Sequence, residues 1–149
     1  MRYITRDDLA AAVSMTELVQ LSNDQMSHYG SAEQPDWAVV DRAIVYAAEL
    51  IDGHISGRYT LPLEPVPGIL PQLATDIARF WLHQRRVNGA DFPKAVQAAY
   101  DNALKMLAAI RDGKIHLGIR NMEEPAGQLQ PERGAYRVRA GEKLNTEGY

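Results

Sequence analysis

The side chains that could do chemistry in this chain are four histidines, two pairs of adjacent carboxylates and a set of serines. The histidines are His28, His54, His83 and His116. No two of them are four residues apart, the spacing that places two imidazoles on one helix face for a metal ion. Asp7-Asp8 suits the positive end of a helix, and Glu123-Glu124 lies in a polar stretch that water would solvate. Because the serines also lack the flanking glycines of a nucleophile elbow, we expect no catalytic residue, no metal site and no cofactor.

A cluster of arginines between positions 79 and 86 allows two interpretations. The basic residues are Arg79, Arg85 and Arg86. Guanidinium groups suit phosphate, so one interpretation is a helix face that binds nucleic acid. The other is a solvated face whose arginines pair with Asp76 or with acids elsewhere in the chain. The mild net charge favours the second interpretation, and a small nucleic-acid-binding helical protein stays the alternative function.

The composition predicts a globular protein with a mild negative charge. The chain has 149 residues and a formal net charge of -3, whereas a dedicated DNA- or RNA-binding domain is strongly basic. The absence of cysteine excludes disulfides, thiolate catalysis and cysteine-bound zinc or iron–sulfur sites. No apolar run approaches the roughly 20 residues that span a bilayer, and the first residues carry no signal-peptide core. We therefore expect a soluble protein with no membrane partner and no export signal.

Apolar residues recur at three- and four-residue steps along most of the chain before Gly113, which predicts two short and three long amphipathic helices. Their predicted ranges are 6–13, 16–21, 36–56, about 69–88 and 91–112. Thr5 and Ser14 are the expected caps of the short helices, with Glu17 placed to complete a capping box after Ser14. We expect Gly57 to end the first long helix, and Asp91 to cap the third, with Pro93 in its first turn.

Residues 57–67 join the first two long helices and combine prolines with apolar side chains. Each proline lacks an amide donor and pushes the residue before it toward extended backbone, so the segment should leave the helical region. Its apolar side chains need a surface to cover them, and we predict a connector that packs as a brace across the helices it joins. The residues of this predicted brace are Gly57, Arg58, Tyr59, Leu61, Pro62 and Leu63. The Arg58 guanidinium could bind Asp76 or backbone carbonyls and pin the connector, or it could bind a partner.

The end of the chain has a different composition. Ile115, Leu117 and Ile119 alternate with polar or small residues, which predicts a brief strand. From Gly118 onward Gly, Pro, Gln, Glu and Arg dominate. We therefore predict a helical domain over residues 1–117 and a tail over residues 118–149 that is disordered, or ordered only on assembly.

Several blocks of the sequence resemble a known family. They lie at residues 3–9, 48–59, 61–63, 66–67, 70–79 and 104–118. The most specific is the block Gly-Arg-Tyr-x-Leu-Pro-Leu at residues 57–63. On these residues the chain resembles the Mu-like phage and prophage head-tail adaptor family, which are small structural proteins encoded among virion morphogenesis genes.

This resemblance implies a mostly helical, non-enzymatic protein with no active-site residues. Connector relatives assemble as rings beneath the portal, so the resemblance implies portal and tail-completion proteins as partners and a homo-oligomeric ring in the particle. It also implies passage of DNA without specific nucleic-acid binding. The expected location is the virion neck, and the bacterial host cytoplasm before assembly. The expected fold class is all-α, a small helical bundle with an extended proline-rich connector and a flexible C-terminal tail.

Overall fold

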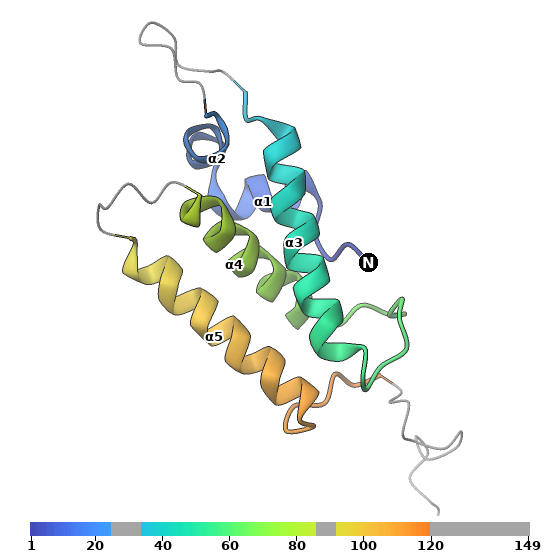
Figure 1. Ribbon diagram of the computed structural model, residues 1–149. Coiled ribbons are helices and arrows are strands. Elements are labelled where there is room, and N and C mark those ends of the chain that lie inside the picture. Colours follow the sequence, from blue (N-terminus) through green and yellow to red (C-terminus); the bar gives the residue numbers. More distant parts are fainter. Residues whose placement is uncertain (25–33, 86–91, 120–149) are drawn as a thin grey trace, which may run out of the picture.

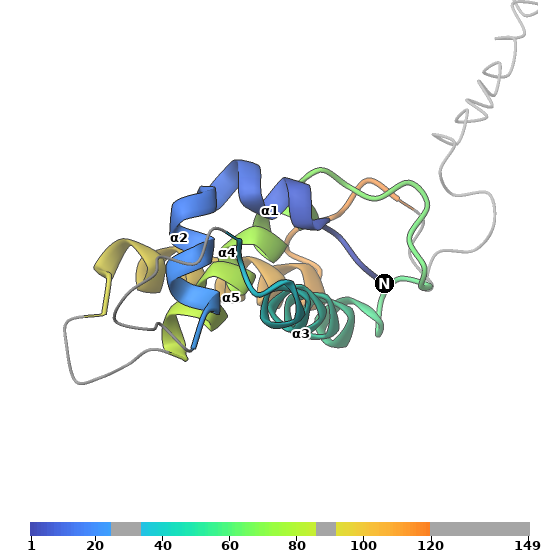
Figure 2. The same cartoon turned by 90° about the horizontal axis from the view of Figure 1, so that it is seen from above.

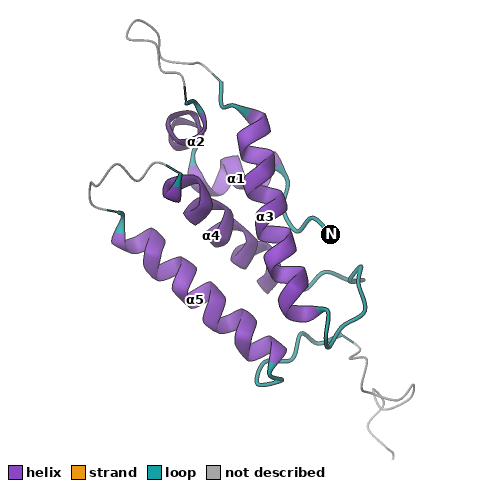
Figure 3. Ribbon diagram, in the orientation of Figure 1, coloured by secondary structure: helices purple, strands orange, loops and turns teal. Residues whose placement is uncertain are grey.

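The computed structural model describes residues 1–24, 34–85 and 92–119, in which it contains five helices (Figure 1). They are α1 (Arg6–Val13), α2 (Met15–Ser22), α3 (Trp37–Ile55), α4 (Ile69–Gln84) and α5 (Lys94–Arg111). Figure 3 shows helices, loops and no strand over these ranges, which confirms the all-α fold class for the described residues. The predicted tail from residue 120 to 149 lies outside them, and the domain boundary at residue 117 stays a prediction.

Helix α4 is central to the arrangement, because it contacts each of the other four helices. The helices α3 and α5 also contact each other, and the three long helices run side by side in Figure 1. The short helices α1 and α2 contact α3 as well as α4, and Figure 2 shows them together on one side of α4. The chain therefore forms a three-helix layer, and the two short helices cover part of one face.

The core consists of the apolar stripes of the long helices. Their most completely buried large side chains are Val40, Ile51, Ile55, Leu70, Ile77, Leu82, Leu107 and Ile110. Most of these residues lie on the predicted stripes, so the helical spacing located the core faces correctly. Tyr100 of α5 is only partly buried, and its ring stacks on Phe80 of α4 with the ring centroids 3.7 Å apart. Burial raises the pKa of Tyr100 to about 12.

The two short helices meet at a single residue. Thr5 Oγ1 accepts a hydrogen bond from the Asp8 amide at 3.2 Å and the Asp8 carboxylate accepts one from the Thr5 amide at 2.8 Å, so the predicted cap of α1 is confirmed. Ser14 ends α1, and its Oγ accepts from the Glu17 amide at 3.3 Å to begin α2. The φ angle of Ser14 is 96°, in a region that L-residues rarely adopt, so this sharp junction carries backbone strain.

Three predicted helix ends need correction. Helix α3 ends at Ile55, and Gly57 does not adopt the left-handed conformation that favours glycine. Helix α4 ends at Gln84, before the predicted end near Asn88, and residues 86–91 lie outside the described residues. At the start of α5, Pro93 is itself the cap residue with an extended ψ of 115°, and the first turn follows it. The predicted cap Asp91 lies outside the described residues.

The predicted strand after α5 is wrong. Ile115, Leu117 and Ile119 all pack against the core, while the residues between them are exposed, so the alternation does report burial. The segment nevertheless pairs with a side chain instead of a strand: the Leu117 amide donates to Tyr59 Oη at 3.1 Å. The two-residue alternation therefore predicted correctly which side chains are covered. It did not predict the backbone, because no strand of the described residues pairs with this segment.

The connector between α3 and α4 lies against the core at two side chains. Tyr59 and Leu63 are buried, with 1% and 3% of their surfaces exposed. Leu61 is partly buried against the same core, whereas Pro62 and Val66 are exposed. The peptide bonds before Pro62 and Pro65 are cis. The connector leads directly into α4. The hydrogen bond from the Leu117 amide to Tyr59 also attaches it to the loop that follows α5.

Candidate functional site

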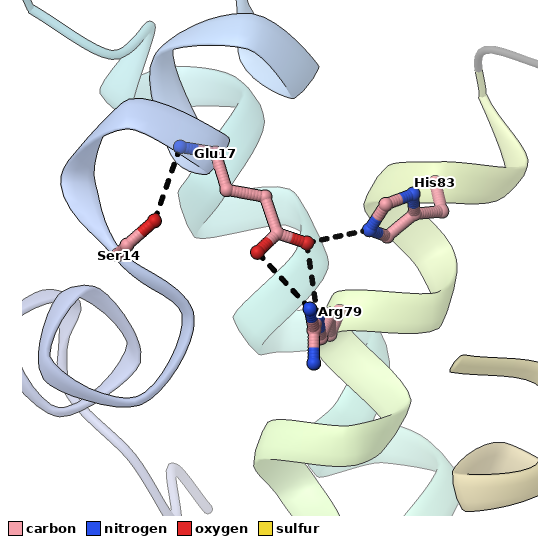
Figure 4. Close-up of polar contacts among 4 residues, drawn as sticks. All are labelled: Ser14, Glu17, Arg79 and His83. Atoms are coloured by element: carbon pink, nitrogen blue, oxygen red, sulfur yellow. Dashed lines mark hydrogen bonds and ion pairs between the residues drawn. The ribbon is translucent and has the colours of Figure 1, made fainter. Parts of the chain in front are cut away.

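The fold brings polar side chains together between α2 and α4 (Figure 4). Arg79 Nε donates to Glu17 Oε1 at 3.0 Å and Arg79 Nη2 donates to Glu17 Oε2 at 3.1 Å, which makes a bidentate ion pair. His83 Nε2 lies 2.6 Å from Glu17 Oε1. Because Arg79 and His83 are four residues apart, they lie on one face of α4 and both reach the same carboxylate. Glu17 therefore holds the short helix α2 on α4.

This Glu17 cluster (Glu17, Arg79 and His83) has some parts of an acid–base site. A carboxylate that orients a histidine is the arrangement that activates a serine nucleophile in many hydrolases. Here the nearby hydroxyl belongs to Ser14, and it accepts from the Glu17 amide at the start of α2 instead of approaching His83 (Figure 4). The geometry of the described residues therefore supports a tie between helices and gives no nucleophile to the histidine.

Arg85 is bound at the end of α4. Its Nη1 donates to the Leu21 carbonyl at 3.1 Å and its Nη2 donates to Asp24 Oδ2 at 2.6 Å. The guanidinium also lies over the ring of Trp81, 5.5 Å from its centroid, where a cation–π attraction adds to the ion pair. Arg85 therefore fastens the C-terminal end of α2 to α4, as Glu17 fastens its first turn.

The predicted basic patch is thus divided in the structure. Arg79 and Arg85 each have a carboxylate partner, and Arg86 lies outside the described residues. Of the two expected kinds of partner, Arg79 has an acid elsewhere in the chain, Glu17, while Asp76 accepts a hydrogen bond from Gln72 at 3.3 Å. Burial raises the pKa of Asp76. This pairing favours the interpretation of the arginines as structural residues over a face that binds nucleic acid.

Arg58, in the predicted brace, lacks the bonds expected under one of its two interpretations, in which it pins the connector. Among the described residues, neither Asp76 nor a backbone carbonyl accepts from its guanidinium, which instead lies directly against Gly113 after α5. A Cβ built on Gly113 would be 2.5 Å from Arg58 Nη1. The contact therefore needs glycine at position 113, and the φ of 79° at Gly113 favours glycine as well.

The first residues of the chain form a further polar contact with α3. Tyr3 Oη donates to Asp52 Oδ1, and burial raises the pKa of Tyr3. Arg6 Nε donates to Asp41 Oδ1 at 2.8 Å, and this bond lowers the pKa of the Asp41 carboxyl. A groove of about 450 Å³ runs between this segment and α3; its lining includes Asp7 and Ile44.

These long-range contacts were not predictable from the sequence pattern. Glu17 is 62 residues from Arg79, and Tyr3 is 49 residues from Asp52. Glu17 had the spacing of a capping-box residue, but its side chain turns to α4 in place of the Ser14 amide. Only the charge of Glu17 and its position near the start of an amphipathic helix could have indicated a contact with a second helix.

The histidines do not come together. His54 bonds to the Leu50 carbonyl, His83 joins the Glu17 cluster and His116 lies in the loop after α5, while His28 is outside the described residues. No three His, Asp or Glu side chains in residues 1–24, 34–85 and 92–119 are grouped as metal ligands would be. Over the same ranges, no helix combines the length and the apolar character that crossing a membrane requires.

Fold and polar contacts together define a small helical protein whose described functional groups hold helices to one another. The sequence pattern of the family described as "Bacteriophage Mu, Gp36" matches residues 3–136. The chain belongs to this family and is a protein of the Mu-like phage type.

Two relatives support this assignment over most of their lengths. "Gene product J" of Escherichia phage Mu is 31% identical over 130 residues, which is 86% of each chain. "Mu-like prophage FluMu protein gp36" of Haemophilus influenzae is 28% identical over 139 residues, covering 93% of this chain and 89% of the relative.

Proposed function

We propose that this protein is a non-enzymatic structural component of a Mu-like particle that joins the head to the tail. In this proposal it binds the portal and tail-completion proteins at the virion neck and assembles there as a homo-oligomeric ring. Before assembly it is present in the bacterial host cytoplasm. DNA passes through the ring without sequence-specific contacts.

Membership of the phage Mu family is the observation that carries the proposal. The pairing inside the chain agrees with it, because the Glu17 cluster and Arg85 are occupied in fastening α2 to α4. A small helical layer held by such ties has rigid outer faces, and rigid faces lower the entropic penalty of binding a neighbour. A ring follows from contacts between two different faces of one chain when the rotation between copies closes.

Electron microscopy and sedimentation of the purified chain, alone and with the portal protein of the same phage, test this proposal. We expect rings, or density attached to the portal. A particle purified from an induced host should also contain the protein, and removal of its gene should leave heads without attached tails. A chain that stays monomeric, ignores the portal and is absent from particles would overturn the proposal.

A duplex-DNA shift assay serves as the matched negative test. Arg79 and Arg85 are bound to carboxylates, so we expect weak binding that Arg79→Gln and Arg85→Gln do not change. Tight, salt-dependent binding that these substitutions abolish would instead favour a nucleic-acid-binding protein.

A further inference from the structure

The described residues contain three partly buried arginines, Arg58, Arg79 and Arg85. Arg58 differs from the other two in its polar contacts. Arg79 and Arg85 have carboxylate partners, whereas Arg58 forms no hydrogen bond or ion pair with any residue that the structure describes. Its Nε is shielded from solvent and has no acceptor. A shielded cationic donor without a partner is unfavourable, so the placement of this guanidinium calls for a physical reason.

The backbone that carries Arg58 is firmly held. The amides of Arg58 and Tyr59 both donate to the Ile55 carbonyl, at 2.9 and 3.0 Å. Tyr59 is buried and accepts from the Leu117 amide, which fixes the chain immediately after Arg58. The Arg58 side chain therefore starts from a defined point on the connector and is not part of a loose surface loop.

The guanidinium itself is seated on the turn that ends α5. A Cβ on Gly113 would be 2.5 Å from Nη1, 2.9 Å from Cζ and 3.1 Å from Nη2 of Arg58, so the whole head group lies against the bare glycine. The contact fixes the head group and supplies no acceptor. Packing against Gly113 restricts the orientation of the planar Arg58 guanidinium before any anion is bound. This restriction reduces the entropy lost on binding.

The turn that Arg58 contacts carries one further cationic side chain. Lys114 follows Gly113, is exposed and has no ion pair among the described residues. The nearby Arg111 is already paired with Asp112 at 3.1 Å. One fixed guanidinium with one neighbouring ammonium suits a single carboxylate, whereas binding to the DNA backbone draws on many cations along a groove.

We propose that Arg58, seated on Gly113, binds a carboxylate of a second copy of this chain when the copies assemble. This inference rests on the proposed function, in which copies form a ring through contacts between two different faces. The partner carboxylate then belongs to a face other than the one with Arg58. Two exposed carboxylates outside the connector form no hydrogen bond or ion pair with described residues, Asp7 in the first turn of α1 and Glu49 on α3.

Charge reversal in the full-length chain tests this inference. Arg58→Gln should weaken assembly at least about tenfold in sedimentation experiments, because it removes one partner of an interfacial charge pair. Arg58→Glu should weaken assembly further, and combining it with Asp7→Arg or with Glu49→Arg should restore assembly for the true partner. Arg111→Gln is the matched control, because it removes a paired arginine from the same end of α5 and should leave assembly unchanged.

Folding of each variant is checked by circular dichroism, and Arg58→Lys, which keeps the charge but loses the fork, should fall between wild type and Arg58→Gln. Rings that form equally well with Arg58→Gln would overturn this inference and leave the proposed ring intact. A wild-type chain that forms no oligomer at any concentration, with or without portal, would overturn both. If neither Asp7→Arg nor Glu49→Arg restores assembly of Arg58→Glu, Asp7 and Glu49 are rejected as partners. If Arg58→Gln loses DNA binding while its assembly is unchanged, Arg58 is assigned to phosphate binding.

Discussion

Two contacts between distant parts of the chain, the α2–α4 contact and the connector–α5 contact, each contain a partly buried arginine, and they are built in opposite ways. At the α2–α4 contact, the Arg79 guanidinium donates two hydrogen bonds to the Glu17 carboxylate. The His83 ring contacts the same carboxylate. At the connector–α5 contact, Tyr59 is buried and hydrogen-bonded to Leu117, but Arg58 has no anionic partner among the described residues. The arginine of the first contact is paired within the chain, whereas the arginine of the second is packed but unpaired over the described residues.

The difference separates stability from recognition. Burial of an aromatic ring contributes more to folding than an ion pair that water still reaches. We therefore expect Tyr59 to matter most for the stability of one chain, the Glu17 cluster to matter less, and Arg58 to matter least. In assembly we expect the order to reverse, with Arg58 foremost. The following substitutions test this ranking in the isolated chain.

Tyr59→Ala should have the largest effect. Removing this ring empties a site that is 1% exposed, and truncation of a buried aromatic residue lowers the free energy of unfolding by about 3–5 kcal/mol. Urea denaturation followed by circular dichroism measures the change. Tyr59→Phe is the control, since it keeps the ring but leaves the Leu117 amide without its acceptor. We expect this loss to lower the free energy of unfolding by about 1–3 kcal/mol. A Tyr59→Ala chain as stable as wild type would show that the connector does not brace the core.

Glu17→Gln should have a moderate effect. It removes the charge that Arg79 and His83 share, and we expect the free energy of unfolding to fall by about 1–2 kcal/mol at low salt. The difference from wild type should shrink as salt is added, because the side chain of Arg79 is 40% exposed. Glu49→Gln, an exposed carboxylate without a partner among the described residues, should change little. Equal effects of the two substitutions would remove the reason for treating the Glu17 cluster as a structural tie.

Asp41→Asn should act through pH. The hydrogen bond from Arg6 lowers the pKa of Asp41 in the folded chain, so the unfolded chain binds this proton more readily. The stabilisation is present above the unfolded pKa and is lost as the pH falls through the folded pKa. Unfolding measured from neutral to acidic pH should therefore show a shallower acid loss in Asp41→Asn than in wild type. A parallel pH profile in the two proteins would contradict this assignment.

Arg58→Gln should have the smallest effect on the isolated chain. The guanidinium has no acceptor to lose in the part of the chain that the structure describes, so we expect a change within about 0.5 kcal/mol in the free energy of unfolding. Arg85→Gln provides the contrast, because it breaks bonds to Asp24 and to the Leu21 carbonyl and should be clearly more destabilising. A large loss of stability in Arg58→Gln alone would mean that this arginine already serves the single chain.

Local signals in the sequence predicted the helices well. Thr5 with Asp8 located the start of α1, and the three- and four-residue spacing of apolar residues located the buried faces of α3, α4 and α5. Helix starts and stripes depend on neighbours within one or two turns, so they can be recognised without knowledge of the fold. The end of α4 was predicted about four residues too late. The strand-like segment after α5 was mispredicted because the core covers its alternating side chains, which local spacing cannot distinguish from a sheet.

The candidate site could be predicted only in part. The pattern singled out Arg58, Arg79 and Arg85. The partners of Arg79 and Arg85, and the glycine that Arg58 contacts, were not evident because each lies on another element. A lone glutamate such as Glu17 fits both a local cap and a distant ion pair, and sequence spacing does not separate the two. The lack of a partner for Arg58 among the described residues had no sequence signal, because it depends on which acidic side chains the fold brings near it.

The seat of Arg58 on Gly113 also has an evolutionary consequence. A Cβ at position 113 would lie 2.5 Å from Nη1 of Arg58, so a substitution there would displace the end of the Arg58 side chain and also strain the backbone, whose φ is 79°. Among homologues, substitution of the glycine should accompany loss of the long basic residue. Lineages that keep Arg58 should therefore keep Gly113, even though 54 residues lie between the two positions in this chain.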